Sequence, residues 1–197
     1  KRHWGSHLPN ANFTRSNLRD LNLECTHFTS ANFVNADLSG VNLSGADLSE
    51  ANFTGANLAR ANLSEADLSG TNFTGANLAF ANLTDADFWE AKFVNAHCYQ
   101  TTFSIDHGSF GGNHRPDFTG ANLVNTDFSG SYHLSAIMTN ANMCNANFRE
   151  ATISDTDFSG AELTGANFSS TELKNVTVSI SQLGAAELNS TVIDRNT

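Results

Sequence analysis

The sequence predicts an all-β solenoid in which a five-residue unit is repeated four times per turn of the chain. Every fifth residue from Leu8 to Ile193 is apolar, and the exceptions are Gly108, Asn113 and His133. Thirteen of the fifteen phenylalanines lie in this register. A period of five fits neither an α-helix, with about 3.6 residues per turn, nor an alternating strand, with a period of about 2. Each unit is therefore expected to form one side of a polygonal coil.

The apolar side chain of each unit is expected to point to the axis of the coil. A small residue, usually Ala, stands two positions earlier, and Asn or Asp lies between them, as in Ala51, Asn52 and Phe53. We expect the small residue to point inward as well, since little room is left there. Asn and Asp suit tight turns because their side chains hydrogen-bond nearby backbone groups. The last two residues of the unit are expected to face water.

Phenylalanines recur at intervals of twenty residues in the first half of the chain, and leucines form two further columns with the same interval. Four units per coil would place identical side chains above one another, where they pack without voids and aromatic rings stack. The predicted core ladder consists of Phe13, Phe33, Phe53, Phe73 and Phe93.

The repeated unit, A-[DN]-[LF]-[ST]-x, resembles that of the pentapeptide repeat family, over roughly Leu8–Ile193. The resemblance implies a right-handed quadrilateral β-helix of about nine coils, with four pentapeptides in each coil. We expect residues 1–9 to form an N-terminal cap and residues 10–197 to form the β-helix. An irregular loop at about 104–117 is expected to interrupt it.

The interruption is rich in turn residues and loses two inward positions, Gly108 and Asn113. Residues 106–115 either fill two sides of a coil irregularly or bulge outward, and the sequence leaves both open. Loops on rigid scaffolds often carry function, whereas the alternative is a tolerated insertion. The residues of this candidate binding loop are Ile105, Asp106, His107, Phe110, His114 and Arg115. At the second irregularity, near His133, we expect Tyr132 or Leu134 to take the inward position.

Acidic residues recur at related outward positions and predict an acidic face. Its members are Asp47, Glu50, Asp67, Asp87, Glu90 and Asp127. One interpretation is a ladder of carboxylates that imitates a nucleic-acid backbone. The other is that Asn and Asp are the two turn-forming residues allowed before each inward residue, so that Asp occurs there without a binding role, on a surface that faces water.

Three aromatic residues outside the inward register, Phe80, Trp89 and Tyr99, form a candidate contact patch. Trp and Tyr are enriched among binding hot spots. The alternative is that these side chains pack beneath the loop and hold it down.

Composition excludes several classes of function. Asp and Glu outnumber Lys and Arg by 20 to 10, for a net charge of −10, which argues against direct binding of nucleic acid. The three cysteines have no zinc-site spacing, and Cys98 occupies an inward position. We expect no catalytic residue, no metal and no cofactor. We also expect no membrane span, because no apolar run of about 18 residues exists. A cytoplasmic location is expected.

The sequence favours a non-enzymatic scaffold for protein–protein interaction, a rigid rod that presents flat faces and one loop to a protein partner. Resemblance to the quinolone-resistance branch of the family implies an alternative, a DNA mimic that binds DNA gyrase. A third interpretation is the repeat domain of a larger protein, such as a secreted effector. End-to-end self-association through the open β-helix ends is a further expectation.

Overall fold

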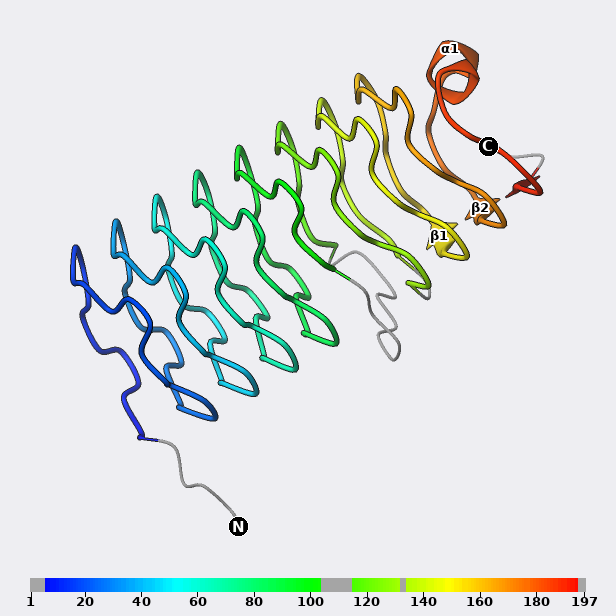
Figure 1. The fold of residues 1–197 in the computed structure, drawn as a ribbon. Helices are drawn as coiled ribbons and strands as arrows, with labels where there is room; N and C mark the ends of the chain where they lie inside the picture. The colour runs from blue at the N-terminus through cyan, green and yellow to red at the C-terminus, as the bar shows by residue number, and fades with distance from the viewer. Residues whose placement is uncertain (1–5, 104–114, 132–133, 195–197) are drawn as a thin grey trace.

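The computed structural model describes residues 6–103, 115–131 and 134–194. The chain winds into stacked coils that form one rod, with the first and last described coils at opposite ends (Figure 1). Parallel pairing joins residues twenty apart, for example Asn32 with Asn52 and Asn52 with Asn72. The predicted coil of four pentapeptides is therefore confirmed. His7 already pairs with His27, so the described part of the predicted cap contributes to the first coil.

Regular secondary structure is assigned only near the C-terminal end of the described residues. Strands β1 (Thr152–Ser154), β2 (Glu172–Lys174) and β3 (Val192–Ile193) form one parallel sheet in the order β1-β2-β3. The short helix α1 (Ile180–Gly184) lies between β2 and β3 in the sequence. In the earlier coils the pairing consists of isolated parallel bridges.

Each corner of the coil is a tight turn. Between one side and the next, the backbone N–H of Ala31 donates to the carbonyl of Phe28 over 2.8 Å, and Ser30 has a φ of +58°. A positive φ at the third of four turn residues is typical of a type II turn, which favours Gly or Asn. The Asn before each inward residue supports the turn, as Asn52 Oδ1 accepts from the N–H of Thr54 over 3.0 Å. The polar positions of the unit therefore shape its corners.

The core consists of the inward apolar side chains and the small residues that precede them. In the predicted ladder, the rings of Phe33 and Phe53 lie 4.6 Å apart and are inclined by 3°. Phe53 and Phe73 follow at 5.2 Å, and Phe73 and Phe93 at 5.0 Å. Phe13 stacks on Phe33 at 5.0 Å but is only partly buried. The core ladder is confirmed.

The rod has four faces, which we name after the inward residues of the coil formed by residues 46–65. They are the Leu48, Phe53, Leu58 and Leu63 faces, in chain order. The Leu48 and Leu58 faces lie on opposite sides of the quadrilateral. Outward amides reinforce the stacking between coils, as on the Leu63 face, where Asn62 Nδ2 donates to Asn42 Oδ1 over 3.1 Å.

The interruption changes the pairing interval from twenty to twenty-five residues. Lys92 pairs with Asp117 and Thr102 pairs with Asp127, whereas the interval of twenty returns between Asp117 and Ile137. The described residues that follow residues 106–115 are therefore displaced by five positions relative to the interval of twenty. Residues 104–114 lie outside the described residues, so the two alternatives, an irregular filling of two sides or an outward bulge, stay open.

The second irregularity agrees with one of the two predicted alternatives. Leu134 is fully buried and pairs with Ile153 of β1. Its backbone N–H donates to the carbonyl of Thr152 over 2.9 Å, as the inward residues of other coils do to theirs. Leu134 thus takes the inward position predicted for Tyr132 or Leu134.

Helix α1 replaces a regular side in the last complete coil. The hydroxyl of Ser179 accepts from the N–H of Gln182, and the Gln182 side chain accepts from the N–H of Ser179, which forms a capping box. Gln182 Nε2 also donates to the carbonyls of Phe158 and Ala161, over 2.8 and 2.7 Å. The side chain of Gln182 thereby covers part of the edge of the preceding coil.

Candidate functional site

Three of the predicted acidic residues form a column on the Leu48 face. Asp47 pairs with Asp67, and Asp67 pairs with Asp87, so their carboxylates lie in adjacent coils. Glu50 and Glu90 stand at the edge between the Leu48 and Phe53 faces, on either side of Gly70. A methyl group at Gly70 would lie 2.5 Å from a Glu50 carboxylate oxygen, so this side chain folds over the glycine.

Asp127 does not belong to this column, and its predicted place on the acidic face is wrong. It pairs with Thr102 on one side and with Asn147 on the other, which places it on the Leu63 face. The five extra residues of the interruption move all later positions by one side of the coil. The Asn147 side chain donates to Asp127 Oδ1 over 3.0 Å, within a ladder of amides.

Asp47 is held by several donors. Burial raises its pKa, but donors outweigh this effect and the pKa is lowered. The Ser49 hydroxyl donates to Oδ1 over 2.6 Å, and the Thr29 hydroxyl donates to Oδ2 over 2.8 Å. His27 Nδ1 lies 3.6 Å from Oδ2. These contacts fix the carboxylate within the turn, as expected of a residue that shapes a corner.

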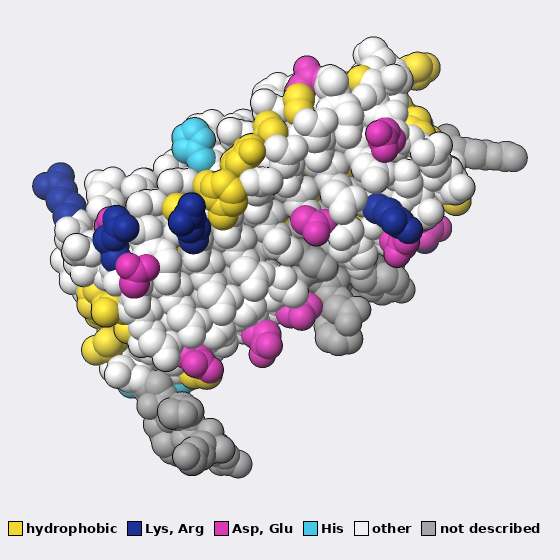
Figure 2. All heavy atoms as spheres, viewed as in Figure 1, with side chains coloured by type: hydrophobic (Ala, Val, Ile, Leu, Met, Phe, Trp, Pro, Cys, Tyr) yellow, Lys and Arg dark blue, Asp and Glu magenta, His cyan; other side chains and the backbone are white. Residues whose placement is uncertain are grey.

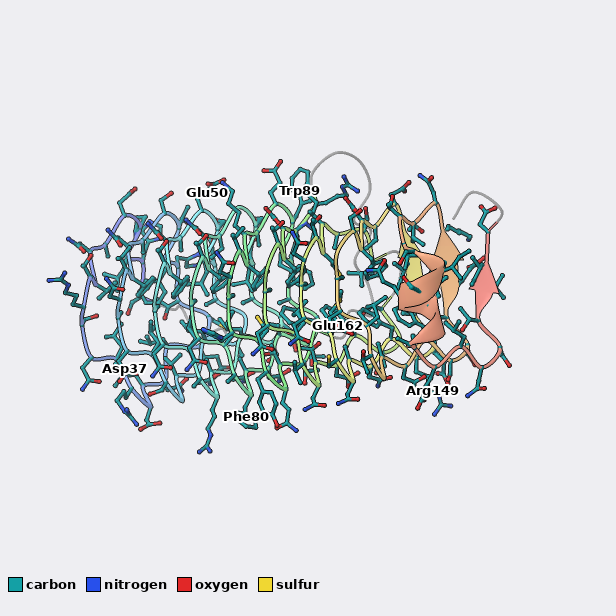
Figure 3. The ribbon with its side chains drawn as sticks, turned by 90° about the horizontal axis from the view of Figure 1, so that it is seen from above. Asp37, Glu50, Phe80, Trp89, Arg149 and Glu162 are labelled. Atoms are coloured by element: carbon teal, nitrogen blue, oxygen red, sulfur yellow. The ribbon has the colours of Figure 1, made fainter. Side chains whose placement is uncertain are left out.

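The three predicted contact aromatics do not form one patch. Phe80 and Tyr99 lie together at the Leu58 face, with ring centroids 5.5 Å apart and planes at 79°. Trp89 lies on the Leu48 face, and Figure 3 shows Trp89 and Phe80 on opposite sides of the rod. Phe80 and Tyr99 are 49% and 37% exposed, and the guanidinium carbon of Arg60 lies 5.8 Å from the centre of the Phe80 ring. The single patch that the sequence predicted is therefore wrong.

Tyr99 belongs to a longer apolar surface that sequence analysis missed, and Phe80 adjoins this surface. The residue after each inward side chain is apolar in successive coils of the Leu58 face. Backbone hydrogen bonds fix this order: Arg60 N–H donates to the carbonyl of Ala79, and Phe80 N–H donates to that of Tyr99, over 2.9 and 2.8 Å. We call this surface the apolar row, and its members are Ala59, Ala79, Tyr99, Val124 and Cys144. Figure 2 shows hydrophobic side chains running along the rod.

Of the predicted binding loop, only Arg115 lies within the described residues; Ile105, Asp106, His107, Phe110 and His114 lie outside them. The Arg115 guanidinium donates to the carbonyl of Asp155. Arg115 also lines a shallow hollow of about 350 Å³, together with Glu50, Gly70, Glu90, Lys92, Asp117 and Ile137. Side chains of both charge signs line this hollow.

No group of three or more His, Cys, Asp or Glu side chains is placed to hold a metal ion within the described ranges. Cys98 is fully buried, and burial strongly raises the pKa of its thiol. Over the same part of the chain, no helix has both the length and the apolar character needed to cross a membrane.

Comparisons with solved structures find pentapeptide repeat proteins and a fluoroquinolone resistance protein. HetL, a pentapeptide repeat protein involved in heterocyst differentiation regulation in the cyanobacterium Nostoc, is 27% identical over 94% of this chain and 82% of its own, with a TM-score of 0.47. The plasmid-mediated fluoroquinolone resistance protein QnrB1 is 16% identical over 97% and 92%, with a TM-score of 0.42. A pentapeptide repeat protein of the Arabidopsis thaliana thylakoid lumen is 28% identical over 71% and 72%, with a TM-score of 0.22. No curated protein matches significantly.

Two family models match most of the chain. The model of pentapeptide repeats matches residues 4–33, 31–70 and 71–104, and the model of a pentapeptide repeat region matches residues 113–188. The second match begins near the end of the interruption, and most of it covers residues where the twenty-residue interval has returned. On this coverage, the chain belongs to the pentapeptide repeat family.

Proposed function

We propose that this chain is a non-enzymatic scaffold that binds a protein partner through the apolar row and the adjoining Phe80 side chain. The observation that carries the proposal is the contrast between faces. On the Leu63 face, the position equivalent to the apolar row holds Ser44, Ser64 and Thr84. On the Leu58 face, the same position holds apolar side chains in successive coils.

The chemistry of the apolar row suits the centre of a protein interface. Interface cores are depleted of charged residues and enriched in aromatic ones, and Tyr is frequent among hot spots. Phe80 and Tyr99 are exposed and in contact with each other, so the pair offers aromatic area without a change of conformation. A rigid surface loses little conformational entropy on binding.

A photo-crosslinking amino acid tests this proposal. Placed at Tyr99, it should capture a protein partner in the native host. Placed at Thr84 on the Leu63 face, it should capture little. The captured partner should then bind wild-type protein and lose affinity about 10- to 100-fold for Tyr99→Ala, as for a hot spot. Equal capture from both positions, or unchanged affinity of the variant, would contradict the proposal.

One observation favours a second function, the DNA mimic that binds a type II topoisomerase. Asp47, Asp67 and Asp87 align in consecutive coils and present like charges at regular intervals. A supercoiling assay with DNA gyrase should then show inhibition that weakens as salt is raised. The triple variant with Asn at these positions keeps the turn chemistry, since Asn occupies the same position in other units. No effect of the wild type at micromolar concentration would eliminate this function.

A further inference from the structure

The apolar row is symmetric about Tyr99 in its distribution along the rod. Ala79 lies one coil before Tyr99, and Val124 lies one coil after it. Ala59 and Cys144 form the two ends, and backbone hydrogen bonds link each member's coil to the next. A rotation of 180° that places Tyr99 on Tyr99 therefore places the whole row on itself.

The Leu58 face carries no carboxylate within the coils that the apolar row spans, and Asp37 and Glu162 lie one coil beyond its two ends. The outward positions of the Leu58 face, in the coils from Asn57 to Asn145, all lie within the described residues. They hold no Asp or Glu, although the chain has twenty such residues. The basic side chains among them are Arg60 and His97, and the other titratable groups are Tyr99 and Cys144 of the row itself. Two copies of a chain with net charge −10 would therefore meet little repulsion between carboxylates within these coils of the face.

The spacing of the side chains along the apolar row also favours one kind of binding partner over another. Its members repeat at the spacing of parallel strands, about 4.8 Å. An α-helix presents its turns at about 5.4 Å and drifts out of register with the row. A second copy of this chain has the same spacing, so its side chains stay opposite each other along the full length of the row.

We propose that the apolar row is a self-association surface, on which a second copy packs antiparallel with Tyr99 near the two-fold axis. This inference rests on the proposed function, because it names the partner of the same surface. In the pair, Ala79 lies opposite Val124 of the second copy, and Ala59 lies opposite Cys144. Such an interface is isologous, since both copies contribute the same surface.

The antiparallel arrangement follows from the place of the apolar row on its face. The row occupies one edge of the Leu58 face, and the column of Asn57, Asn77 and His97 occupies the other. An axis across the rods reverses their direction and brings the two rows together. An axis along the rods keeps them parallel and places each row on the polar column of the other copy.

The area of this face predicts a weak dimer. The row extends over roughly 20 Å, and a face of that length buries on the order of 300 Å² per copy. Stable interfaces bury about 800 Å² per partner. We therefore expect dissociation constants in the range of roughly 10 to 1,000 μM.

Sedimentation velocity over a range of concentrations tests the proposal on the full chain. The weight-average mass of the wild type should rise from monomer toward dimer. Ala79→Glu should raise the dissociation constant at least about tenfold, because a carboxylate would be buried without a partner. Thr74→Glu, at the equivalent position of the Phe53 face in the same coil, should behave as the wild type. Circular dichroism confirms that both variants fold.

Crosslinking tests the orientation. In a Cys25→Ser background, Ala59→Cys and the natural Cys144 of a second copy should be joined by a short bis-maleimide. Thr54→Cys, on the Phe53 face, should give no dimer band. A dimer that forms without the Ala59→Cys crosslink overturns the antiparallel arrangement.

A wild type that stays monomeric up to about 1 mM, or an Ala79→Glu variant that dimerises like the wild type, overturns self-association. The scaffold proposal has its own test. It stands if a different protein is still captured from Tyr99, and it fails if that capture is absent too.

Discussion

Phe93 stacks on Phe118 with ring centroids 4.7 Å apart and planes inclined by 10°, although twenty-five residues separate them. Phe73 and Phe93, twenty residues apart, stack at 5.0 Å. The core ladder therefore passes the interruption without a change in ring packing. The inward side chains, rather than the length of chain between them, determine where each coil lies.

Removal of a ring from this ladder should destabilise the protein. Phe53 is fully buried between Phe33 and Phe73. Phe53→Ala should lower the free energy of unfolding by about 3–5 kcal/mol, because it leaves a cavity. Phe53→Leu should cost less, since Leu occupies other inward positions. Chemical denaturation measures both, and Phe80→Ala, at an exposed position, is the matched control with a change within about 0.5 kcal/mol. Equal effects of Phe53→Ala and Phe80→Ala would refute the ladder's role.

The thiol of Cys98 should be protected in the native protein. It is fully buried and its pKa is raised by burial, so little thiolate forms. Cys25 and Cys144 are half-buried. A thiol reagent should label these two under native conditions and all three after denaturation. Rapid native labelling of Cys98, located by mass spectrometry, would contradict the packing described.

Gly75 tests the corner conformation. Its φ is +65°, and a methyl group there would meet no atom within 4 Å, so space does not limit substitution. Gly75→Ala should still cost about 1–2 kcal/mol, because Ala disfavours the left-handed region. Gly75→Asn should cost less, as Asn tolerates positive φ and occupies corners such as Asn95 at +54°. Thermal unfolding of the two variants compares these costs, and a more stable Ala variant would contradict the expectation.

Stability should fall in acid through Asp37. The Ser39 hydroxyl, which donates to Asp37 Oδ1 over 2.8 Å, holds the pKa of Asp37 below its usual value, and Arg19 adds to this effect against the desolvation of the carboxyl. A lowered folded-state pKa contributes stability above the unfolded value, near 4, and this stability is lost as the pH falls through the folded value. Ser39→Ala should raise the pKa of Asp37 in an NMR titration. An unchanged titration would rule out the serine as the cause.

Gln182 should hold the C-terminal coil in place. Its amide donates to the carbonyls of Phe158 and Ala161. Gln182→Glu removes both donors and should speed hydrogen exchange in the last coil about tenfold or more, while the coils around Phe53 exchange as before. Ser181→Ala, on the same helix, is the control. Uniform acceleration along the rod would instead indicate global destabilisation.

The regular part of this fold could be predicted from the sequence because one side of a coil has a fixed length. From Phe13 to Phe93 the interval of twenty is strict, and the ladder was placed correctly. The predicted face of Asp127 is wrong because the repeat pattern does not show how many residues the interruption adds to its coil. Once the interruption exceeds a side by five residues, every later position moves to the neighbouring face.

The surface was harder to predict than the core. Trp89 and Phe80 are both outside the inward register, but their faces differ because they belong to units that lie two sides apart around the coil. The apolar row shows an interval of twenty from Ala59 to Tyr99, and the longer interval to Val124 conceals its continuation. Weak preferences at outward positions become visible only when coils are aligned in space.

The twenty-five-residue coil has a practical consequence for engineering. The coils before and after this longer coil keep their parallel pairing. Residues added between Phe103 and Phe118 should therefore leave the neighbouring coils undisturbed. A foreign peptide inserted there would be presented on a rigid β-helix, and the neighbouring coils would fix the positions of its two ends. The molecule thus offers an insertion site between two coils whose pairing is already compatible with five additional residues.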